Sequence, residues 1–292
     1  MRRVKDFAAT NPAVFGGVFF LSITCLYILA GLFLTSFRPG MLCVVETEIE
    51  YVGYTRYILT ESLLRLALAV PAIIFLGWIF KTNGFRYAFS TKGFSAGLFA
   101  GSAFLLFSLW YLGEFYFGAE SSNFMIGSDS APSLIIPITV LLCVTMSLFE
   151  ESVFRGLLMG GILRSWSASP NGRVSMVLIS GLVFGAAYYF IINHIHIITF
   201  ETSALLTLAW GVGVSAVYLY SKNLLVCIFL HTVHSLIVSF SSLVTGPMSA
   251  GGTLWRGWNV SGFIVLFAVI PVFAIILSIN AKPFNEIKEI NC

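Results

Sequence analysis

The chain has 292 residues, of which 58% are hydrophobic and only 10% are charged. A water-soluble globular protein needs more polar surface than this composition supplies, so a lipid bilayer is the expected surroundings of most of the chain. The formal net charge of +3 is small and dispersed, which argues against nucleic acid as a partner. The five cysteines are scattered singly, and three fall inside apolar segments, so no disulfide framework is expected.

Apolar stretches of about twenty residues, the length that crosses roughly 30 Å of hydrocarbon, recur along the whole chain. They predict an all-α fold, a polytopic membrane helix bundle of about eight transmembrane helices in a single membrane domain over residues 1–292. The expected spans are Ala13–Leu34, Ser62–Phe80, Ala96–Phe115, Leu134–Leu163, Val174–Ile192, Ser203–Tyr220, Leu224–Leu243 and Gly262–Ile279.

Lysine and arginine predict how these spans are oriented, because positive residues accumulate on the cytoplasmic side of a membrane. With the N-terminus inside, the outer segments hold only Arg38, Arg56 and Arg256. The inner segments then hold Arg2, Arg3, Lys5, Lys81, Arg86, Lys92, Arg164, Arg173, Lys222, Lys282 and Lys288. Both termini are therefore predicted to be cytoplasmic. The first span is too long for the apolar region of a signal peptide, so it is predicted to be a retained anchor.

Small residues recur at every fourth position in several spans, a pattern that lets helix backbones approach closely. The pattern indicates ordinary helix packing rather than chemistry. It is formed by Gly93, Gly97 and Gly101, by Gly156 and Gly160, and by Gly181 and Gly185.

A pair of glutamates interrupts the longest apolar stretch, in the segment EESVFR from Glu150 to Arg155. A charged side chain at bilayer depth costs about 2.5 to 3.5 kcal/mol, so it indicates a partner or a function. Adjacent residues point about 100° apart on a helix; Glu151 is therefore expected to pair with Arg155 while Glu150 faces elsewhere. A free carboxylate in a low-dielectric medium suits a general base for water. A buried ion network that only locks helices together is the alternative.

His231 lies inside the seventh span, and His234 and Ser235 follow it on roughly the same helix face. A histidine there can bind a metal, position a water molecule or donate a hydrogen bond to an oxyanion. A lone buried histidine is more often a packing residue, but its coincidence with the intramembrane glutamate pair favours a functional role.

The fifth span offers two further candidates, Tyr188 and His194. At 1.5 Å per residue, His194 would lie about 30 Å from the inner face of the membrane and His231 about 12 Å from it. Straight helices would keep the two histidines apart, whereas Tyr188 lies closer to the level of His231. A tilted or broken fifth span would allow His194 to take part, so both candidates stay open. The pair Glu61 and Arg65, at the outer edge of the second span, is interpreted as an interfacial ion pair without a further role.

With these residues in view, the chain resembles the CPBP family of CAAX-protease and bacteriocin-processing membrane proteins, which includes the CAAX prenyl endopeptidase. The resemblance covers Leu134 to Phe240, with a core at about residues 134–243. EESVFR matches the family pattern EExxxR, and His231 matches the third motif, where Ser235 replaces the more common asparagine. The second motif, FxxxH, places Tyr188 at the expected histidine in one frame and His194 in the other.

The resemblance implies an intramembrane endopeptidase that cleaves a membrane-associated, possibly prenylated, peptide or protein. Glu150 would be the base that activates water, and His231 would orient the water or stabilise the oxyanion. Glu151, Arg155 and Ser235 would support them. No cofactor is favoured; zinc, if present, would be bound by Glu150, His194 and His231.

Two other functions compete with proteolysis. A catalytically silent relative, serving as a membrane scaffold or in immunity to a peptide, is suggested by Tyr188 and Ser235. A proton-coupled transporter would use the intramembrane Glu and His residues as a proton relay. The lack of a recognisable inverted repeat argues against the transporter.

Overall fold

The computed structural model describes residues 2–36, 48–118, 135–195, 200–245 and 269–284, and these ranges contain helices and no strands. The predicted all-α fold is thus confirmed for this part of the chain. The helices are α1 (Arg2–Thr10), α2 (Pro12–Ser36), α3 (Glu48–Ile79), α4 (Gly84–Ala88), α5 (Phe94–Gly118), α6 (Ile135–Glu151), the π-helix η2 (Ser152–Ile162), the 3-10 helix η3 (Arg164–Ala168), α7 (Pro170–Ile195), α8 (Phe200–Ser221), α9 (Leu224–Thr245) and α12 (Ile270–Asn280).

Three of the described helical stretches are long and apolar enough to cross a membrane: Pro12–Ala30, Ile58–Ile79 and Ile136–Ile162. Shorter apolar helices cover Phe94–Leu106, Leu224–Ile237 and Ile270–Asn280. Each of the predicted spans overlaps a helix of the structure, although the beginning of the last one, residues 262–268, lies outside the described residues. These helices support an integral membrane protein, and the number of eight crossings stays a prediction.

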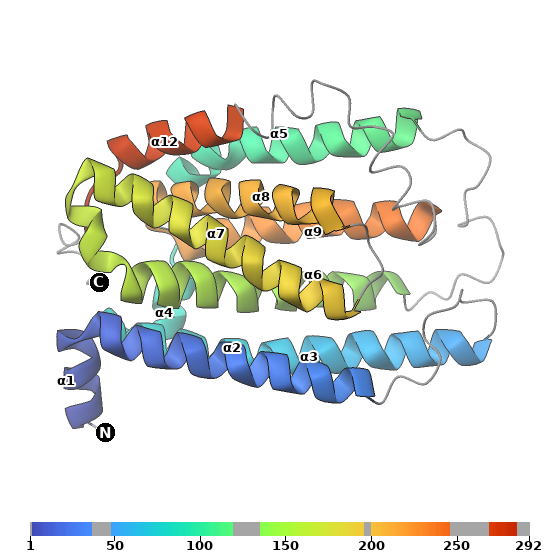
Figure 1. Ribbon diagram of the computed structural model, residues 1–292, viewed down its shortest axis with the longest axis horizontal. Coiled ribbons are helices and arrows are strands. Elements are labelled where there is room, and N and C mark those ends of the chain that lie inside the picture. Colours follow the sequence, from blue (N-terminus) through green and yellow to red (C-terminus); the bar gives the residue numbers. More distant parts are fainter. Residues whose placement is uncertain (1, 37–47, 119–134, 196–199, 246–268, 285–292) are drawn as a thin grey trace.

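The continuous helical stretch formed by α6 and η2 occupies the middle of the bundle (Figure 1). It packs against α2 and α3 on one side and against α7 and α9 on the other. α7 runs obliquely along α8, while α5 and α12 lie on the far side of α8 and α9 (Figure 1). Because α6 lies between the N-terminal pair of helices and the C-terminal group, its polar residues can contact both.

The described positive residues assigned to the inner side belong to elements at one end of the bundle, and Lys288 lies outside the described residues. α1, α4 and η3 lie at this end, and α12 ends there too (Figure 1). Arg173 closes the end of α12 by donating hydrogen bonds to the backbone oxygens of Ser278 and Ile279, at 2.9 and 3.0 Å. The structure therefore agrees with the grouping of these residues, while their cytoplasmic location stays a prediction.

The glycines of α7 allow it to approach α8 closely, as predicted. A Cβ atom at Gly181 would lie 2.8 Å from the backbone nitrogen of Val212, and one at Gly185 would lie 3.2 Å from the Cα atom of Leu208. The glycines at 97, 101, 156 and 160 face side chains of neighbouring helices instead. Cys25, Cys143 and Cys227 are free among the described residues, while Cys43 and Cys292 lie outside them, so the expected lack of a disulfide framework stays a prediction.

Candidate active site

The two glutamates lie at the junction of α6 and η2, where the backbone changes from α-helical to π-helical hydrogen bonding. At the end of η2, the N–H group of Leu163 donates to the oxygen of Leu158, five residues earlier, at 2.9 Å. π-helical turns are rare and occur frequently at functional sites, because the extra residue per turn redirects side chains. The glutamate pair is therefore located where the helix itself departs from regular geometry.

Glu151 is fully buried and is held by two donors. Its Oε1 atom accepts a hydrogen bond from Nη1 of Arg155 at 3.1 Å and another from Nδ1 of His231 at 2.7 Å. Arg155 is also fully buried; its Nη2 donates to the backbone oxygen of Gly211 at 3.1 Å, and its guanidinium lies 4.6 Å from the ring centroid of Phe184. The predicted pairing of Glu151 with Arg155 is confirmed.

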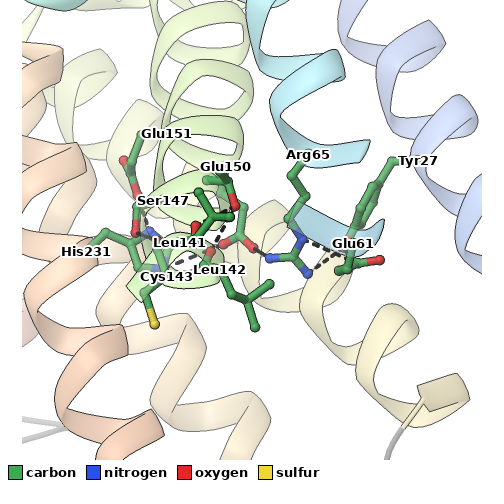
Figure 2. A network of polar contacts seen from close by, with 11 residues as sticks. Tyr27, Glu61, Arg65, Leu141, Leu142, Cys143, Ser147, Glu150, Glu151 and His231 are labelled. Carbon is green, nitrogen blue, oxygen red and sulfur yellow. Dashed lines mark hydrogen bonds and ion pairs between the residues drawn. The ribbon is translucent and has the colours of Figure 1, made fainter. Parts of the chain in front are cut away.

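His231 faces both glutamates from α9, as the close view shows (Figure 2). Since a carboxylate can only accept, the short contact with Glu151 assigns a proton to Nδ1 of His231. The other ring nitrogen, Nε2, lies 3.7 Å from Oε2 of Glu150. This separation is too long for a direct hydrogen bond, and a water molecule could contact both atoms only from beside them. Among the described residues, Oε2 of Glu150 has no hydrogen-bond partner.

The opposite oxygen of Glu150 faces a third charged residue, Arg65 of α3. Nη1 of Arg65 lies 3.5 Å from Oε1 of Glu150, although 85 residues separate the two in sequence. The predicted pair of Glu61 and Arg65 is present, with Nε 2.9 Å from Oε1 of Glu61. Its surroundings differ from the expectation, since the side chains of Glu61 and Arg65 are only 8% and 12% exposed and both contact the hydroxyl group of Tyr27. The pair belongs to the same polar network as the glutamates (Figure 2).

The network contains one more carboxylate than guanidinium groups among the described residues, so charge balance requires one further proton. Among its described members, three carboxylates (Glu61, Glu150 and Glu151) face two guanidinium groups (Arg65 and Arg155). An uncompensated buried charge is costly. One proton on His231 or on Glu150 balances the charge, and these are the two groups that face each other across 3.7 Å.

The remaining predicted residues are placed only in part. Ser235 is buried on α9, one turn after His231. Tyr188 and His194 lie on the unbroken helix α7, but their side chains are outside the described residues, so their roles stay predictions. Phe184, whose ring centroid is 6.0 Å from that of His231, marks the level of the site on α7. Along a helix, His194 follows this level by about 15 Å and Tyr188 by about 6 Å.

The predicted zinc set is not completed by the residues that can be described. No group of three or more His, Cys, Asp or Glu side chains is arranged as metal ligands in this part of the chain. Glu150 and His231 could supply two ligands, as predicted, while the third, His194, has no described side chain. The positive charge of Arg65 next to Glu150 also disfavours a divalent cation there. Zinc binding by Glu150, His194 and His231 therefore stays a prediction.

His234 makes different contacts from those of His231, although it lies only three residues later. Its Nδ1 atom is 2.9 Å from Oγ of Ser108, and its ring stacks on Trp210 at a centroid distance of 4.0 Å. These contacts join α9 to α5 and α8. His234 therefore fits a packing role next to the site.

The residues that carry the resemblance to the CPBP family, Glu150, Glu151, Arg155 and His231, contact one another in the structure. Residues 132–237 match the sequence model of the Rce1-like type II CAAX prenyl endopeptidases. The resemblance is thereby confirmed over this segment, which begins and ends close to the expected core. No curated protein and no solved structure matches the chain.

The matched segment contains Glu150, Glu151, Arg155 and His231 but excludes Tyr27, Glu61 and Arg65. Reasoning from the sequence did not predict that these last three residues join the polar network of the glutamates. One signal was present, because Glu61 and Arg65 are charged residues at the edge of an apolar span. Their contact with Glu150 depends on how α3 packs against α6, which residue spacing does not reveal.

Proposed function

We propose that this protein is an intramembrane endopeptidase in which Glu150 activates a water molecule and His231 stabilises the oxyanion. The single observation that carries the proposal is the arrangement of Oε2 of Glu150 and Nε2 of His231 on either side of a 3.7 Å separation. A base and a donor that face a common position meet the geometric requirement for attack of water on a carbonyl group. The match to prenyl endopeptidases supports peptide-bond hydrolysis over other reactions of water.

The proton positions of the site are consistent with this chemistry. When His231 carries the balancing proton, Nδ1–H donates to Glu151 while Nε2–H remains for a developing oxyanion. Glu150 is then a carboxylate. It accepts a proton as the water oxygen bonds to the scissile carbonyl carbon, and it returns the proton to the leaving nitrogen as the C–N bond breaks. The products are a carboxylic acid and an amine, Glu150 is again a carboxylate, and no step of this scheme uses a metal.

The proposed substrate is a membrane-associated peptide or protein, possibly prenylated, because the site lies on helices that are apolar enough to enter a bilayer. Glu150 and His231 are 6% and 3% exposed. Low exposure favours the reaction, since each electrostatic contact is stronger where water is excluded.

The test is cleavage of fluorogenic peptides, prenylated and unprenylated, by the purified full chain in detergent. We expect Glu150→Gln to lower the cleavage rate by about 10²–10⁴-fold, the usual contribution of a general base. Asp6→Asn is the matched control, because it neutralises an exposed carboxylate on α1 and should leave the rate unchanged. A chelator should have no effect. Equal rates for Glu150→Gln and the wild type would contradict the proposal, and so would no cleavage by the wild type of any peptide.

A further inference from the structure

Arg65 is fixed from two directions by residues outside the segment that matches the endopeptidase family. Its Nε donates to Oε1 of Glu61 at 2.9 Å, and its Nη2 donates to the hydroxyl oxygen of Tyr27 at 2.6 Å. The Tyr27 hydroxyl in turn donates to Oε1 of Glu61 at 2.8 Å. The three side chains form a closed ring of hydrogen bonds, and these distances are typical of strong charge-assisted contacts.

The guanidinium of Arg65 also reaches the candidate base. Its Nη1 atom is 3.5 Å from Oε1 of Glu150, longer than a well-formed N–H···O hydrogen bond but close enough for attraction between opposite charges. Because a guanidinium is a rigid plane, fixing Nε and Nη2 also fixes the direction in which Nη1 points. Tyr27 on α2 and Glu61 on α3 therefore fix the position of this charge independently of the conformation of Glu150.

The long contact with Glu150 has a structural cause. Arginine and a carboxylate prefer a two-pronged pair with short distances, which would hold both oxygens of Glu150. Glu61 and Tyr27 already accept hydrogen bonds from Nε and Nη2 of Arg65, and the contact with Glu150 is made by Nη1. As a result, Oε1 of Glu150 is attracted toward α3 while Oε2 stays directed toward His231 (Figure 2).

We infer that Arg65 is a positioning residue of the site, which fixes the orientation of the Glu150 carboxylate and is itself held by Glu61 and Tyr27. The inference rests on the proposed function of Glu150 as the base. It makes α2 and α3 part of the working site rather than an anchor next to it. A small displacement of a catalytic group lowers the reaction rate strongly. The contact between Arg65 and Glu150 would therefore support the rate by holding the carboxylate in place.

The experiment compares kcat and KM for peptide cleavage by Arg65→Met, Arg65→Lys and Tyr27→Phe in the full chain. Arg65→Met should lower kcat by about 10- to 100-fold with KM changed less than about threefold, because orientation of the base affects the reaction step. Arg65→Lys should restore part of kcat, since it keeps the charge but lacks the planar fork. Tyr27→Phe should lower kcat by less than Arg65→Met.

Two controls separate positioning from a general loss of stability. Tyr87→Phe removes a buried hydroxyl group that contacts the hydroxyl of Tyr218 at 2.5 Å, far from the glutamates, and is matched to Tyr27→Phe. Arg173→Lys changes a buried arginine at the end of the bundle and is matched to Arg65→Lys. Both should keep the kcat of the wild type even if they lower the unfolding temperature. An unchanged kcat in Arg65→Met, or an equal loss in the controls, would overturn the inference.

A second readout works without activity and separates this inference from the proposed function. A hydrophobic carbodiimide reacts with buried carboxyl groups in their protonated form, and the adduct on Glu150 can be measured by mass spectrometry. Removing the nearby positive charge in Arg65→Met should increase the fraction of Glu150 modified at neutral pH. If the wild type cleaves no peptide but this increase is found, the proposed function fails and the contact is upheld. Equal modification in both proteins overturns the inference.

Discussion

Nδ1 of His231 lies 2.7 Å from Oε1 of Glu151, so the second glutamate of the pair fixes the orientation of the imidazole. This leaves Nε2 turned toward Glu150, the first glutamate. Two adjacent carboxylates therefore have different surroundings. Oε1 of Glu151 accepts hydrogen bonds from Arg155 and His231 at 3.1 and 2.7 Å, whereas Oε1 of Glu150 has a longer contact with Arg65 at 3.5 Å. Oε2 has no hydrogen-bond partner among the described residues in either glutamate. The difference is consistent with the proposed roles of Glu151 as a supporting residue and of Glu150 as the base.

Replacement of His231 tests whether this ring takes part in the reaction. We expect His231→Gln to lower the rate of peptide cleavage by about 10²–10³-fold, the usual cost of losing an oxyanion donor. The unfolding free energy should fall by about 1–3 kcal/mol, because buried Glu151 loses a donor. Rates and thermal unfolding in detergent measure both effects. His234→Gln is the control, since His234 contacts Ser108 and Trp210, and its rate should stay within about tenfold of the wild type. A larger loss in the control than in His231→Gln would contradict this assignment.

Loss of Arg155 should destabilise the fold, because Glu151 would keep a buried charge without its guanidinium partner. Breaking a buried ion pair by removing one member costs about 3–5 kcal/mol. We therefore expect a reduction of this size in the unfolding free energy of Arg155→Met, and recovery of part of it in the double variant Glu151→Gln/Arg155→Met. A double-mutant cycle from unfolding in denaturant measures the coupling. Additive effects of the two substitutions would mean that the 3.1 Å contact contributes nothing.

A methyl group at Gly181 should separate α7 from α8. Its Cβ would lie 2.8 Å from the nitrogen and 3.0 Å from the Cα atom of Val212, both backbone atoms that cannot move alone. We expect Gly181→Ala to lower the unfolding free energy by about 1–3 kcal/mol, as is usual for an overpacked contact. At Gly17 the nearest atoms are 4.0 Å away, so Gly17→Ala should be neutral or slightly stabilising. Thermal unfolding of both variants gives the comparison, and equal stability would contradict the predicted contact.

Lys222 predicts a pH dependence of stability at the end of the bundle. It lies between α8 and α9 with its Nζ atom 3.7 Å from the ring centroid of Phe284. Burial, with a smaller contribution from the charge of Arg173, lowers the pKa of Lys222 from 10.5 to about 7. Between these two values the unfolded chain binds a proton that the folded chain does not, so stability rises with pH. Below about pH 7 both states are protonated and the cost of burying the charge is fully present.

The comparison that isolates this effect is wild type against Lys222→Met. From about pH 6 to about pH 9, the unfolding temperature of the wild type should rise relative to that of the variant. The variant should be the more stable protein at the acidic end, because methionine carries no charge to bury. A constant difference across this range would mean that Lys222 keeps its ordinary pKa in the folded protein.

Much of the fold could be predicted because a helix that crosses a bilayer needs about twenty consecutive apolar residues, and such stretches can be recognised in the sequence. The apolar stretches gave helices at the expected places, and the i,i+4 spacing of Glu151 and Arg155 gave an ion pair that the structure confirms. The glycine pattern of α7 correctly indicated a close helix contact. The change to π-helical hydrogen bonding at Ser152 was not predicted from the residue pattern.

The sequence by itself determined which residues are costly in a bilayer and therefore need partners: Glu150, Glu151, Arg155 and His231. Local helix geometry then separated the two glutamates. Only the tertiary structure decided which ring nitrogen faces which carboxylate, and that Arg65 of α3 contacts Glu150. The physical reason is that spacing along one helix defines a face, whereas a contact between helices depends on their rotation and depth. Both are set by the packing of all the apolar side chains together.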